Sequence, residues 1–429
     1  MSQRARDLAF PAAVGALLIA VCFLPGCGGG SEATATPEPV NPGGPAVSVP
    51  PAVQQAKEAS TPVDAAIVTA DNTFGLNVLN TLIQGNAGNN TAIAPISIAM
   101  ALQITYNGAV GSTQQAMAQT LQLGGLGVSQ LNSDNAALLG ALLDPDPQVD
   151  LTIANSLWVP LGSNTVSAAF VSADQTYYGA EIGDIAGAPA NVNAWVAAQT
   201  QGEITQILGP GDYVTVVANT VYFKGQWTDG FQPSQTVPLP FTLADGTQAT
   251  VPTMQQTGAF SFFQGANFQA VSLPYGQGRL SMLLVLPAVG VDLDTFVAGI
   301  TPAAIDSWVS QMSPGVTVSL NLPRFTTSFG TSLVPTLTTL GMGSAFDPNA
   351  GGLSGLISGG YISDIEHKTY VQVDETGTIA AAATTVTVTT GVAAPSVNLH
   401  LDHPFFYAIR DNQTGELLFV GVLMNPNAG

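Results

Sequence analysis

The sequence predicts an α+β fold, because helical and strand patterns both occur but do not alternate as regular βαβ units. Helical spacing of apolar residues is frequent in the first half of the chain, whereas strand patterns dominate from Tyr213 onward. No linker rich in Pro, Gly or Ser interrupts residues 62–426, and no internal repeat is visible. This segment should therefore form either one large domain or two packed lobes.

Helices are expected where apolar residues recur at intervals of three or four. One such set precedes the loop at residues 85–90 and consists of Phe74, Val78, Leu79 and Leu82. Pro95 can open the next helix, which should end at Asn107-Gly108. Ser112 and Gln115 have the spacing of a capping box and predict another helix start. Further helices are expected over residues 192–208 and near residues 293–312 and 332–340.

One strand in the first half of the chain is predicted by alternation. Its alternating residues are Leu151, Ile153, Asn155, Leu157 and Val159.

Residues 1–26 have the pattern of a signal peptide, because Arg4 and Arg6 precede an apolar run over residues 8–24. The sequence Leu24-Pro25-Gly26-Cys27 resembles the lipobox of bacterial lipoproteins, in which the cysteine becomes the lipidated first residue. An uncleaved membrane anchor is the alternative, since the run is near spanning length. We expect export and lipidation of Cys27 at the cell envelope or surface, or release to the extracellular space.

Residues 27–61 are expected to form a disordered tether, because Gly, Pro, Ala, Thr and Val predominate and large apolar residues are few. Residues 62–429 would then make up the folded domain. Cys22 and Cys27 are the only cysteines, so a chain that begins at Cys27 keeps one. It could form neither an internal disulfide nor a thiolate metal site.

The most unusual stretch runs from Asp374 to Gly391. An acidic pair and a glycine come first, four alanines follow, and Thr then alternates with Val. Alanine favours helices and the Thr/Val alternation favours strands. As a strand, the stretch would place small or β-branched residues on one face, namely Thr378, Ala380, Ala382, Thr384, Val386 and Val388. Because no charge occurs from Thr376 to Leu399, the stretch can be buried within a sheet.

Residues 373–382 resemble the hinge of the reactive-centre loop of serpins, the serine protease inhibitor family. A Thr/Ala-rich linker is the alternative for this stretch alone. Other segments similar to serpin motifs follow in the family's order, at residues 90–121, 154–159, 192–204, 218–227 and 402–421. The resemblance implies a bacterial, lipoprotein-type member with the serpin fold, which has three β-sheets, about eight or nine helices and an exposed reactive-centre loop.

The resemblance also assigns residues to the centre of the large sheet. Ser97, Asn219 and His367 match serpin residues that form a hydrogen-bonded cluster beneath two central strands. The plainer alternatives are an early-helix serine and a core histidine bonded to a backbone carbonyl. Ala94 stands where many serpins carry a second serine, so the cluster should have fewer hydrogen bonds.

A second set belongs to the end of the sheet, where the loop begins. The hinge residues are Glu375, Gly377, Thr378, Ala380 and Ala382. Arg324 matches the basic residue that pairs with Glu375 in the family, and arginine can hold a carboxylate through two hydrogen bonds. Trp227 belongs at the same opening, with a core aromatic as the alternative.

The scissile bond is expected within a short window of small or medium, uncharged residues. The window consists of Thr390, Gly391, Val392 and Ala393. A trypsin-like pocket requires Arg or Lys, so elastase-like or subtilisin-like proteases fit best.

Enzyme signatures are missing from the sequence: it has no Gly-x-Ser-x-Gly, Walker or His-Glu-x-x-His motif. We interpret His400 and His403 as surface residues and expect no metal and no cofactor. Without residues 1–26, which contain Arg4, Arg6 and Asp7, the eight basic and 28 acidic residues fall to six and 27. Six scattered cations cannot build a phosphate- or sulfate-binding stripe, so neither nucleic acid nor heparin is an expected partner.

The expected function is suicide inhibition of a serine-type endopeptidase by a monomer. As the resemblance implies, the protease would attack the loop, form a covalent acyl complex and be distorted when the cut loop inserts as a strand. The alternative is a non-inhibitory, surface-anchored serpin that acts in binding or adhesion. A hydrolase is not expected.

Overall fold

Among the described residues, most helices lie in the first half of the chain and most strands lie in the second. The computed structural model describes residues 49–161, 166–378 and 397–428, which all belong to one compact unit, Pro45–Gly429. Of the two organisations that the sequence allowed, the structure therefore has the single large domain. The predicted helix with Phe74, the helix opened by Pro95 and the strand with Leu151 are all confirmed.

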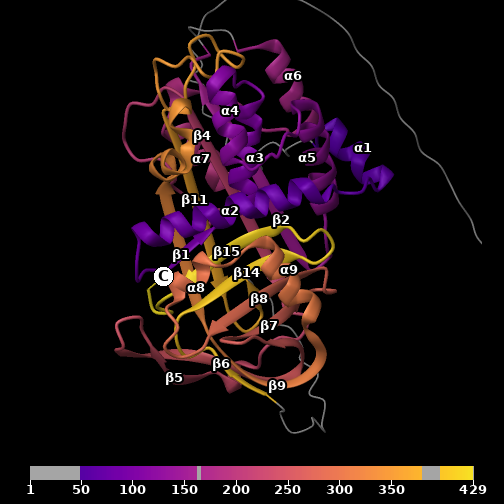
Figure 1. Ribbon diagram of the computed structural model, residues 1–429, viewed down its shortest axis with the longest axis vertical. Coiled ribbons are helices and arrows are strands. Elements are labelled where there is room, and N and C mark those ends of the chain that lie inside the picture. Colours follow the sequence, from indigo (N-terminus) through magenta and orange to yellow (C-terminus); the bar gives the residue numbers. More distant parts are fainter. Residues whose placement is uncertain (1–48, 162–165, 379–396, 429) are drawn as a thin grey trace, which may run out of the picture. The chain divides into compact units, whose positions relative to one another are not determined.

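Ten α-helices lie within the described ranges, and none of them is long and apolar enough to cross a membrane. Figure 1 labels helices α1 to α9. Several begin at a polar N-cap: the side chains of Asp64, Asp292 and Thr301 each accept a hydrogen bond from a backbone N–H in the first turn. The helices are α1 Pro51–Ala59, α2 Ala65–Gly85, α3 Pro95–Tyr106, α4 Gly111–Thr120, α5 Val128–Leu142, α6 Ala168–Tyr177, α7 Ala190–Gln199, α8 Leu293–Ala298, α9 Pro302–Gln311 and α10 Val334–Leu337.

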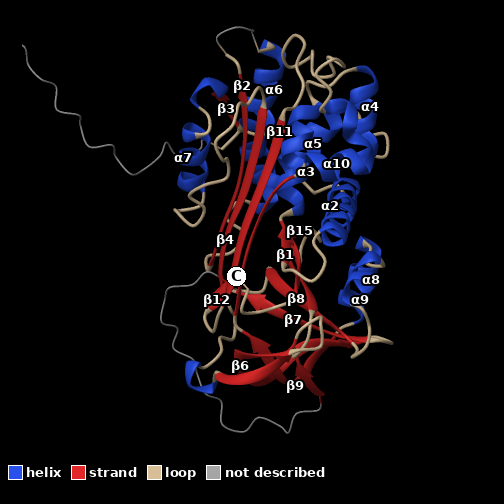
Figure 2. Cartoon of the chain, turned by 90° about the vertical axis from the view of Figure 1, so that its left-hand side faces the viewer, coloured by secondary structure: helices blue, strands red, loops and turns tan. Residues whose placement is uncertain are grey.

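A six-stranded sheet runs in the order β10-β11-β12-β4-β2-β3. Its strands are β2 Val149–Val159, β3 Glu181–Asp184, β4 Val216–Gln226, β10 Phe325–Ser332, β11 Asp364–Val373 and β12 Gly377–Thr378. Helix α3 contacts β2 and β4 on one face of this sheet, and α7 contacts them on the other (Figure 2). The centre of the sheet is therefore covered on both sides.

A second sheet has nine strands in the order β1-β15-β14-β8-β7-β6-β9-β13, with β5 paired to β6. Its strands are β1 Thr91–Ile93, β5 Val237–Thr242, β6 Gln248–Gln264, β7 Phe268–Tyr275, β8 Leu280–Pro287, β9 Ser313–Pro323, β13 Val397–His400, β14 Phe405–Asp411 and β15 Leu417–Leu423. Strands β8, β14 and β15 are buried along their whole lengths, so the core of the domain lies around them.

Helix α1 corrects the predicted extent of the tether, because it lies within residues 27–61. Val53 is only 3% exposed, and α1 packs against α5 and α6. The approach is close at Gly140 of α5, where a Cβ would lie 3.0 Å from the backbone N of Lys57 and the backbone O of Val53. The burial of α1 depends on partners from far along the chain, so composition alone did not reveal it.

Two local predictions about helices were wrong. The helix predicted over residues 192–208 ends at Gln199, because Gln201 and Gly202 take positive φ values of 52° and 88°. The Oγ1 of Thr200 then accepts the N–H of Ile204 and closes a turn. Helix α4 begins at Gly111 without a side-chain cap, so Ser112 lies within the first turn and is not the N-cap.

We expect Gly140→Ala to lower the thermal midpoint of the protein, although alanine within a helix usually stabilises by about 1 kcal/mol over glycine. The new methyl group would force α1 away from α5. Differential scanning fluorimetry checks this result. Gly85→Ala in α2 is the control, because a Cβ there meets nothing within 4 Å. An equal gain in both variants would contradict the close packing of α1.

Candidate functional site

The two central strands of the six-stranded sheet part along their length. β4 and β11 pair in parallel from Val216–Asp364 to Asn219–His367. Near their other ends β12 lies between them, because Thr378 pairs with both Val373 and Gly225. The sheet is thus closed at one end of this strand pair, and a segment of the hinge occupies the other end (Figure 2).

A buried hydrogen bond lies at the last position where β4 and β11 pair directly. Nδ1 of His367 and Oδ1 of Asn219 are 2.6 Å apart, and both residues are 0% exposed. The backbone N–H of Ala94, just before α3, donates to Nε2 of His367 at 3.2 Å. Since Nε2 accepts, Nδ1 carries the proton and donates to Asn219. His367 therefore joins β11 to β4 and to the start of α3.

The imidazole of His367 stays neutral over the ordinary pH range. Burial lowers its pKa to about 3. The unfolded side chain would take up a proton below about pH 6.5, so this residue favours the folded state less as the pH falls from 6.5 toward 3.

Ser97 does not join these hydrogen bonds, which corrects the cluster predicted from the resemblance. It lies in the first turn of α3 and is fully buried, but its Oγ has no hydrogen-bond partner among the residues that the structure describes. The physical reason is that His367 is already satisfied, with Ala94 on one ring nitrogen and Asn219 on the other. The structure therefore brings two of the three predicted residues together and leaves Ser97 out.

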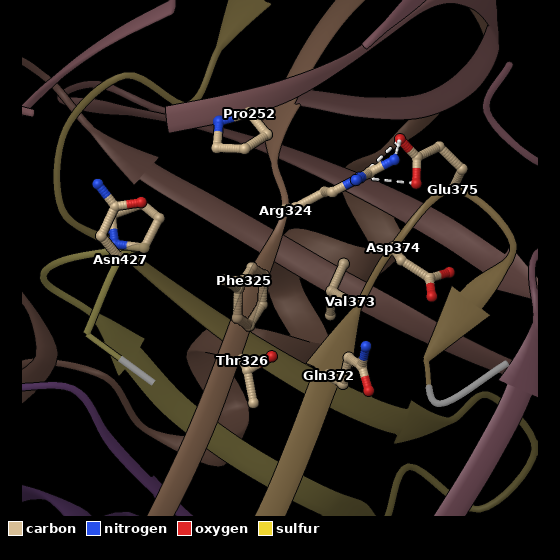
Figure 3. Close-up of a pocket in the computed structure, with 10 residues that line it drawn as sticks. Pro252, Arg324, Phe325, Thr326, Gln372, Val373, Asp374, Glu375 and Asn427 are labelled. Carbon is tan, nitrogen blue, oxygen red and sulfur yellow. Dashed lines mark hydrogen bonds and ion pairs between the residues drawn. The ribbon is translucent and has the colours of Figure 1, made fainter. Parts of the chain in front are cut away.

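The predicted partners Glu375 and Arg324 meet at the end of the sheet (Figure 3). Nε of Arg324 donates to both carboxylate oxygens of Glu375, at 2.7 and 2.8 Å, and the Oγ1 of Thr236 also donates to this carboxylate. The Glu375 side chain is only 6% exposed, whereas that of Arg324 is 44% exposed. The pair borders a pocket of about 580 Å³. Its lining residues are Pro252, Arg324, Phe325, Thr326, Gln372, Val373, Asp374, Glu375, Pro426 and Asn427.

The carboxyl group of Glu375 is held in its ionised form. Burial alone would raise its pKa, but the hydrogen bonds from Arg324 and Thr236 outweigh burial and leave the pKa lowered. The charge is therefore part of the structure at this end of the sheet.

Trp227 fixes the backbone of the hinge next to this ion pair. The indole Nε1 of Trp227 donates to the backbone O of Asp374 at 2.9 Å, and the backbone N–H of Trp227 donates to the backbone O of Thr376 at 3.0 Å. The indole stacks on Tyr275, with ring centroids 4.4 Å apart. Trp227 is thus both a core aromatic and a hinge contact, so the two interpretations of this residue are compatible.

Gly377 and Thr378 form the part of the hinge that has entered the sheet. Thr378 is 1% exposed, and its Oγ1 lies 2.6 Å from the hydroxyl of Tyr275. A Cβ on Gly377 would lie 1.9 Å from the backbone O of Gly225, so only glycine fits there. Ala380, Ala382, the window Thr390–Ala393 and Cys27 lie outside the described residues.

His403 is not the surface residue that we expected. Its side chain is 17% exposed, and its ring nitrogens lie 2.7 Å from Oδ1 of Asp402 and 2.8 Å from the backbone O of Pro287. It was misjudged because its burial comes from β8, which is distant in sequence. In the described ranges, no group of three or more His, Cys, Asp or Glu residues could hold a metal ion.

Sequence reasoning missed three residues of the site: Tyr275, Thr236 and the backbone N–H of Ala94. Tyr275 and Thr236 contact the hinge from segments about 100 and 140 residues away in the chain, and no motif marks them. Ala94 had been noted only for its missing hydroxyl. The remaining signal was the place of Ala94 directly before Pro95, the first residue of α3. This place leaves the N–H of Ala94 outside the helix and free to donate to His367.

The central strands of this sheet part and admit a segment of the same chain. This arrangement is typical of proteins whose sheets can take up an additional strand. Comparisons with known proteins identify the family. The model of the family described as "Serpin (serine protease inhibitor)" matches residues 69–426. Human leukocyte elastase inhibitor is 31% identical over 83% of this chain and 99% of its own length. A serpin-like protein of Thermococcus kodakarensis is 33% identical over 85% of this chain and 86% of its own length.

Solved structures agree with this result. The thermophilic serpin tengpin in its native state is similar with a TM-score of 0.79 and 26% identity, over 85% of this chain and 95% of tengpin. Thyroxine-binding globulin in complex with thyroxine has a TM-score of 0.74 and 25% identity, over 84% of this chain and 99% of its own. The chain belongs to the serpin family, whose members are generally protease inhibitors and not enzymes. The predicted α+β serpin fold is confirmed.

Asn219→Ala should lower the stability of the protein by about 1–3 kcal/mol, because it leaves the buried Nδ1–H of His367 without an acceptor. Ser97→Ala is the matched control and should be neutral or slightly stabilising, since the hydroxyl that it removes has no partner. Thermal midpoints at pH 7 compare the two variants. Equal destabilisation by both would mean that Ser97 does contribute to the cluster.

Glu375→Gln should loosen the hinge and lower the thermal midpoint by about 1 °C, which corresponds in a domain of this length to about 1 kcal/mol for an ion pair with one partly exposed partner. In the wild type, the contribution of Glu375 is present above pH 4.5 and is lost as the pH falls through its lowered folded pKa. The emission of Trp227, taken as the difference from a Trp227→Phe variant, reports the hinge. Exposed Glu203 provides the control Glu203→Gln. If Glu375→Gln and Glu203→Gln had the same acid transition in Trp227 emission, the ion pair of Glu375 with Arg324 would not hold the hinge.

Proposed function

We propose that this serpin inhibits a serine-type endopeptidase by letting its cut loop enter the six-stranded sheet between β11 and β4. The observation that carries the proposal is the position of Thr378, which already pairs with both strands. In the proposed mechanism, the protease attacks the loop as a substrate and forms a covalent acyl complex with it. Insertion then carries the protease along the sheet and distorts its active site before the acyl bond is hydrolysed.

The register of β12 supports insertion of the residues that follow it. Val373 pairs with Thr378 in an antiparallel sense, so a longer strand in this register would place residues 380, 382 and 384 opposite Val371, Thr369 and His367. These three residues of β11 are buried, and their inserted partners would be two alanines and a threonine. Such small, uncharged side chains can enter the interior without the desolvation cost of a charge.

The same register indicates where insertion meets resistance. A strand that reaches residue 384 must separate His367 from Asn219, because these residues pair directly in the present structure. Each inserted residue then gains sheet hydrogen bonds worth about 0.5–1.5 kcal/mol net. We infer that the hydrogen bond between His367 and Asn219 holds the sheet closed until the loop is cut.

The kind of target follows from the loop sequence. Thr390, Gly391, Val392 and Ala393 are small or medium and uncharged, which favours elastase-like or subtilisin-like proteases with small apolar pockets. We propose a monomer that acts outside the cytoplasm and is attached to the cell envelope or surface through a lipid on Cys27. The segment Leu24–Cys27 supports this location.

A denaturing gel tests the proposal directly. Purified residues 28–429 are mixed with an elastase-like protease and with a subtilisin-like protease. Inhibition should produce a band larger than the serpin by about the mass of the protease, because the acyl bond survives denaturation. Clean cleavage without this band would favour the alternative, a non-inhibitory binding or adhesion protein.

Thr378→Arg should convert the inhibitor to a substrate, because a charged side chain would replace a hydroxyl that is 1% exposed within the sheet. The covalent band should fall at least tenfold while cleavage of the loop continues. Thr339→Arg is the control, since Thr339 is exposed near α10. Undiminished inhibition by Thr378→Arg would count against strand insertion.

A further inference from the structure

Two carboxyl groups are buried together away from the hinge, where α2 meets the connection between β14 and β15. Asp71 lies on α2 and Glu416 lies directly before β15, and both residues are 0% exposed. The two residues are neighbours in the fold, because Asn72, which follows Asp71, hydrogen-bonds the backbone of Gly415 and Leu417 on either side of Glu416. Neither residue belongs to the functional site described above.

The hydrogen bonds around this pair leave too few donors for two ionised carboxylates. Nε2 of Gln103 donates to Oδ1 of Asp71 at 2.6 Å. The other oxygen of Asp71, both carboxyl oxygens of Glu416 and Oε1 of Gln103 have no hydrogen-bond partner within the described ranges. All four would be acceptors if both carboxyls were ionised. A buried set made only of acceptors is costly, and a proton on a carboxyl group turns one of them into a donor.

Among the described residues, the arginines in and next to the β-strands around the pair are already paired. Arg279 donates to Asp411, and Arg410 donates to Asp306. The other titratable groups on the elements packed around the pair are acids or tyrosines. They are Tyr106 on α3, Asp134 on α5, Asp174 on α6, Tyr178 after α6, and Asp292 and Asp294 at α8. The charge of Asp411 acts on Glu416 and disfavours its ionisation further.

The backbone on both sides of Glu416 is fixed by Asn72, the residue next to Asp71. Nδ2 of Asn72 donates to the backbone O of Gly415 at 2.9 Å, and Oδ1 of Asn72 accepts the N–H of Leu417 at 2.9 Å. These hydrogen bonds hold the backbone of Glu416 against α2, and its side chain is buried there, with the residue 0% exposed. Its carboxyl group must be accommodated inside the protein.

We propose that Asp71 and Glu416 hold protons in the folded protein and form a pH-dependent lock between α2 and the β14–β15 connection. The contact between α2 and the β14–β15 connection is strong while the two carboxyl groups are protonated, and it weakens when they ionise. Burial raises the pKa of Asp71 to about 8, despite the hydrogen bond from Gln103. Burial, with the charges of Asp71 and Asp411, also raises the pKa of Glu416 well above its ordinary value.

The direction of the pH dependence follows from proton linkage. An unfolded aspartate releases its proton near pH 3.8, whereas the folded Asp71 keeps it until about pH 8. Between these values the folded state binds more protons, so stability falls as the pH rises. Each retained proton makes the unfolding equilibrium constant about tenfold larger per pH unit.

Urea unfolding followed by circular dichroism at pH 6, 7, 8 and 9 tests the lock. The midpoint of the wild type should fall over this range. Glu416→Gln removes one retained proton, so the unfolding constant should rise about tenfold less per pH unit than in the wild type. The double variant Asp71→Asn, Glu416→Gln should flatten the dependence further. Other buried carboxyls contribute equally to each protein, and Glu58→Gln, at an exposed position of α1, should match the wild type.

Infrared spectroscopy in D₂O gives a second measurement that needs no unfolding. At pH 7 the wild type should show a band from protonated carboxyl groups, and this band should be smaller in Glu416→Gln. Equal bands in the two proteins, or urea midpoints that fall in parallel with pH, would overturn the proposal.

Discussion

The hydrogen bond between His367 and Asn219 is the interaction on which the rest of the sheet depends. It lies at the last position where β4 and β11 pair directly. On one side of it the strands form a continuous sheet, and on the other the hinge has begun to separate them. Because Nε2 of His367 also accepts the N–H of Ala94, the same ring ties the strands to the start of α3. Opening the sheet therefore disturbs a helix as well as a strand pair.

Scarcity of positive charge is a second constraint. The chain has eight Lys and Arg residues against 28 Asp and Glu. Arg324 is used at the hinge, where it keeps the buried Glu375 ionised with help from Thr236. Arg279 and Arg410 are paired with Asp411 and Asp306. Buried acids that are left without a cation, such as Asp71, have a raised pKa instead.

Several patterns of neighbouring residues predicted their elements, although two local helix predictions were wrong, and burial that depends on distant partners was not predicted. The apolar spacing of α2, the proline at the start of α3 and the alternation of β2 all survive in the structure. Helix α1 was missed because α5 supplies its burial. The helix over residues 192–208 was predicted too long, since a turn at Gln201 and Gly202 stops it. Ser97 was assigned to a cluster in which its hydroxyl finds no partner.

The sequence by itself determined the class of fold, the family and the chemical character of the hinge, because each of these depends on residue types and their order along the chain. Small neutral residues after Glu375 make burial of that segment possible whatever surrounds it. Only the tertiary structure decided how far the hinge has entered the sheet, that Tyr275 and Thr236 contact it, and that Asp71 meets Glu416. Such contacts join residues about 100 to 345 positions apart, and their geometry depends on the packing of the whole domain, which no local pattern records.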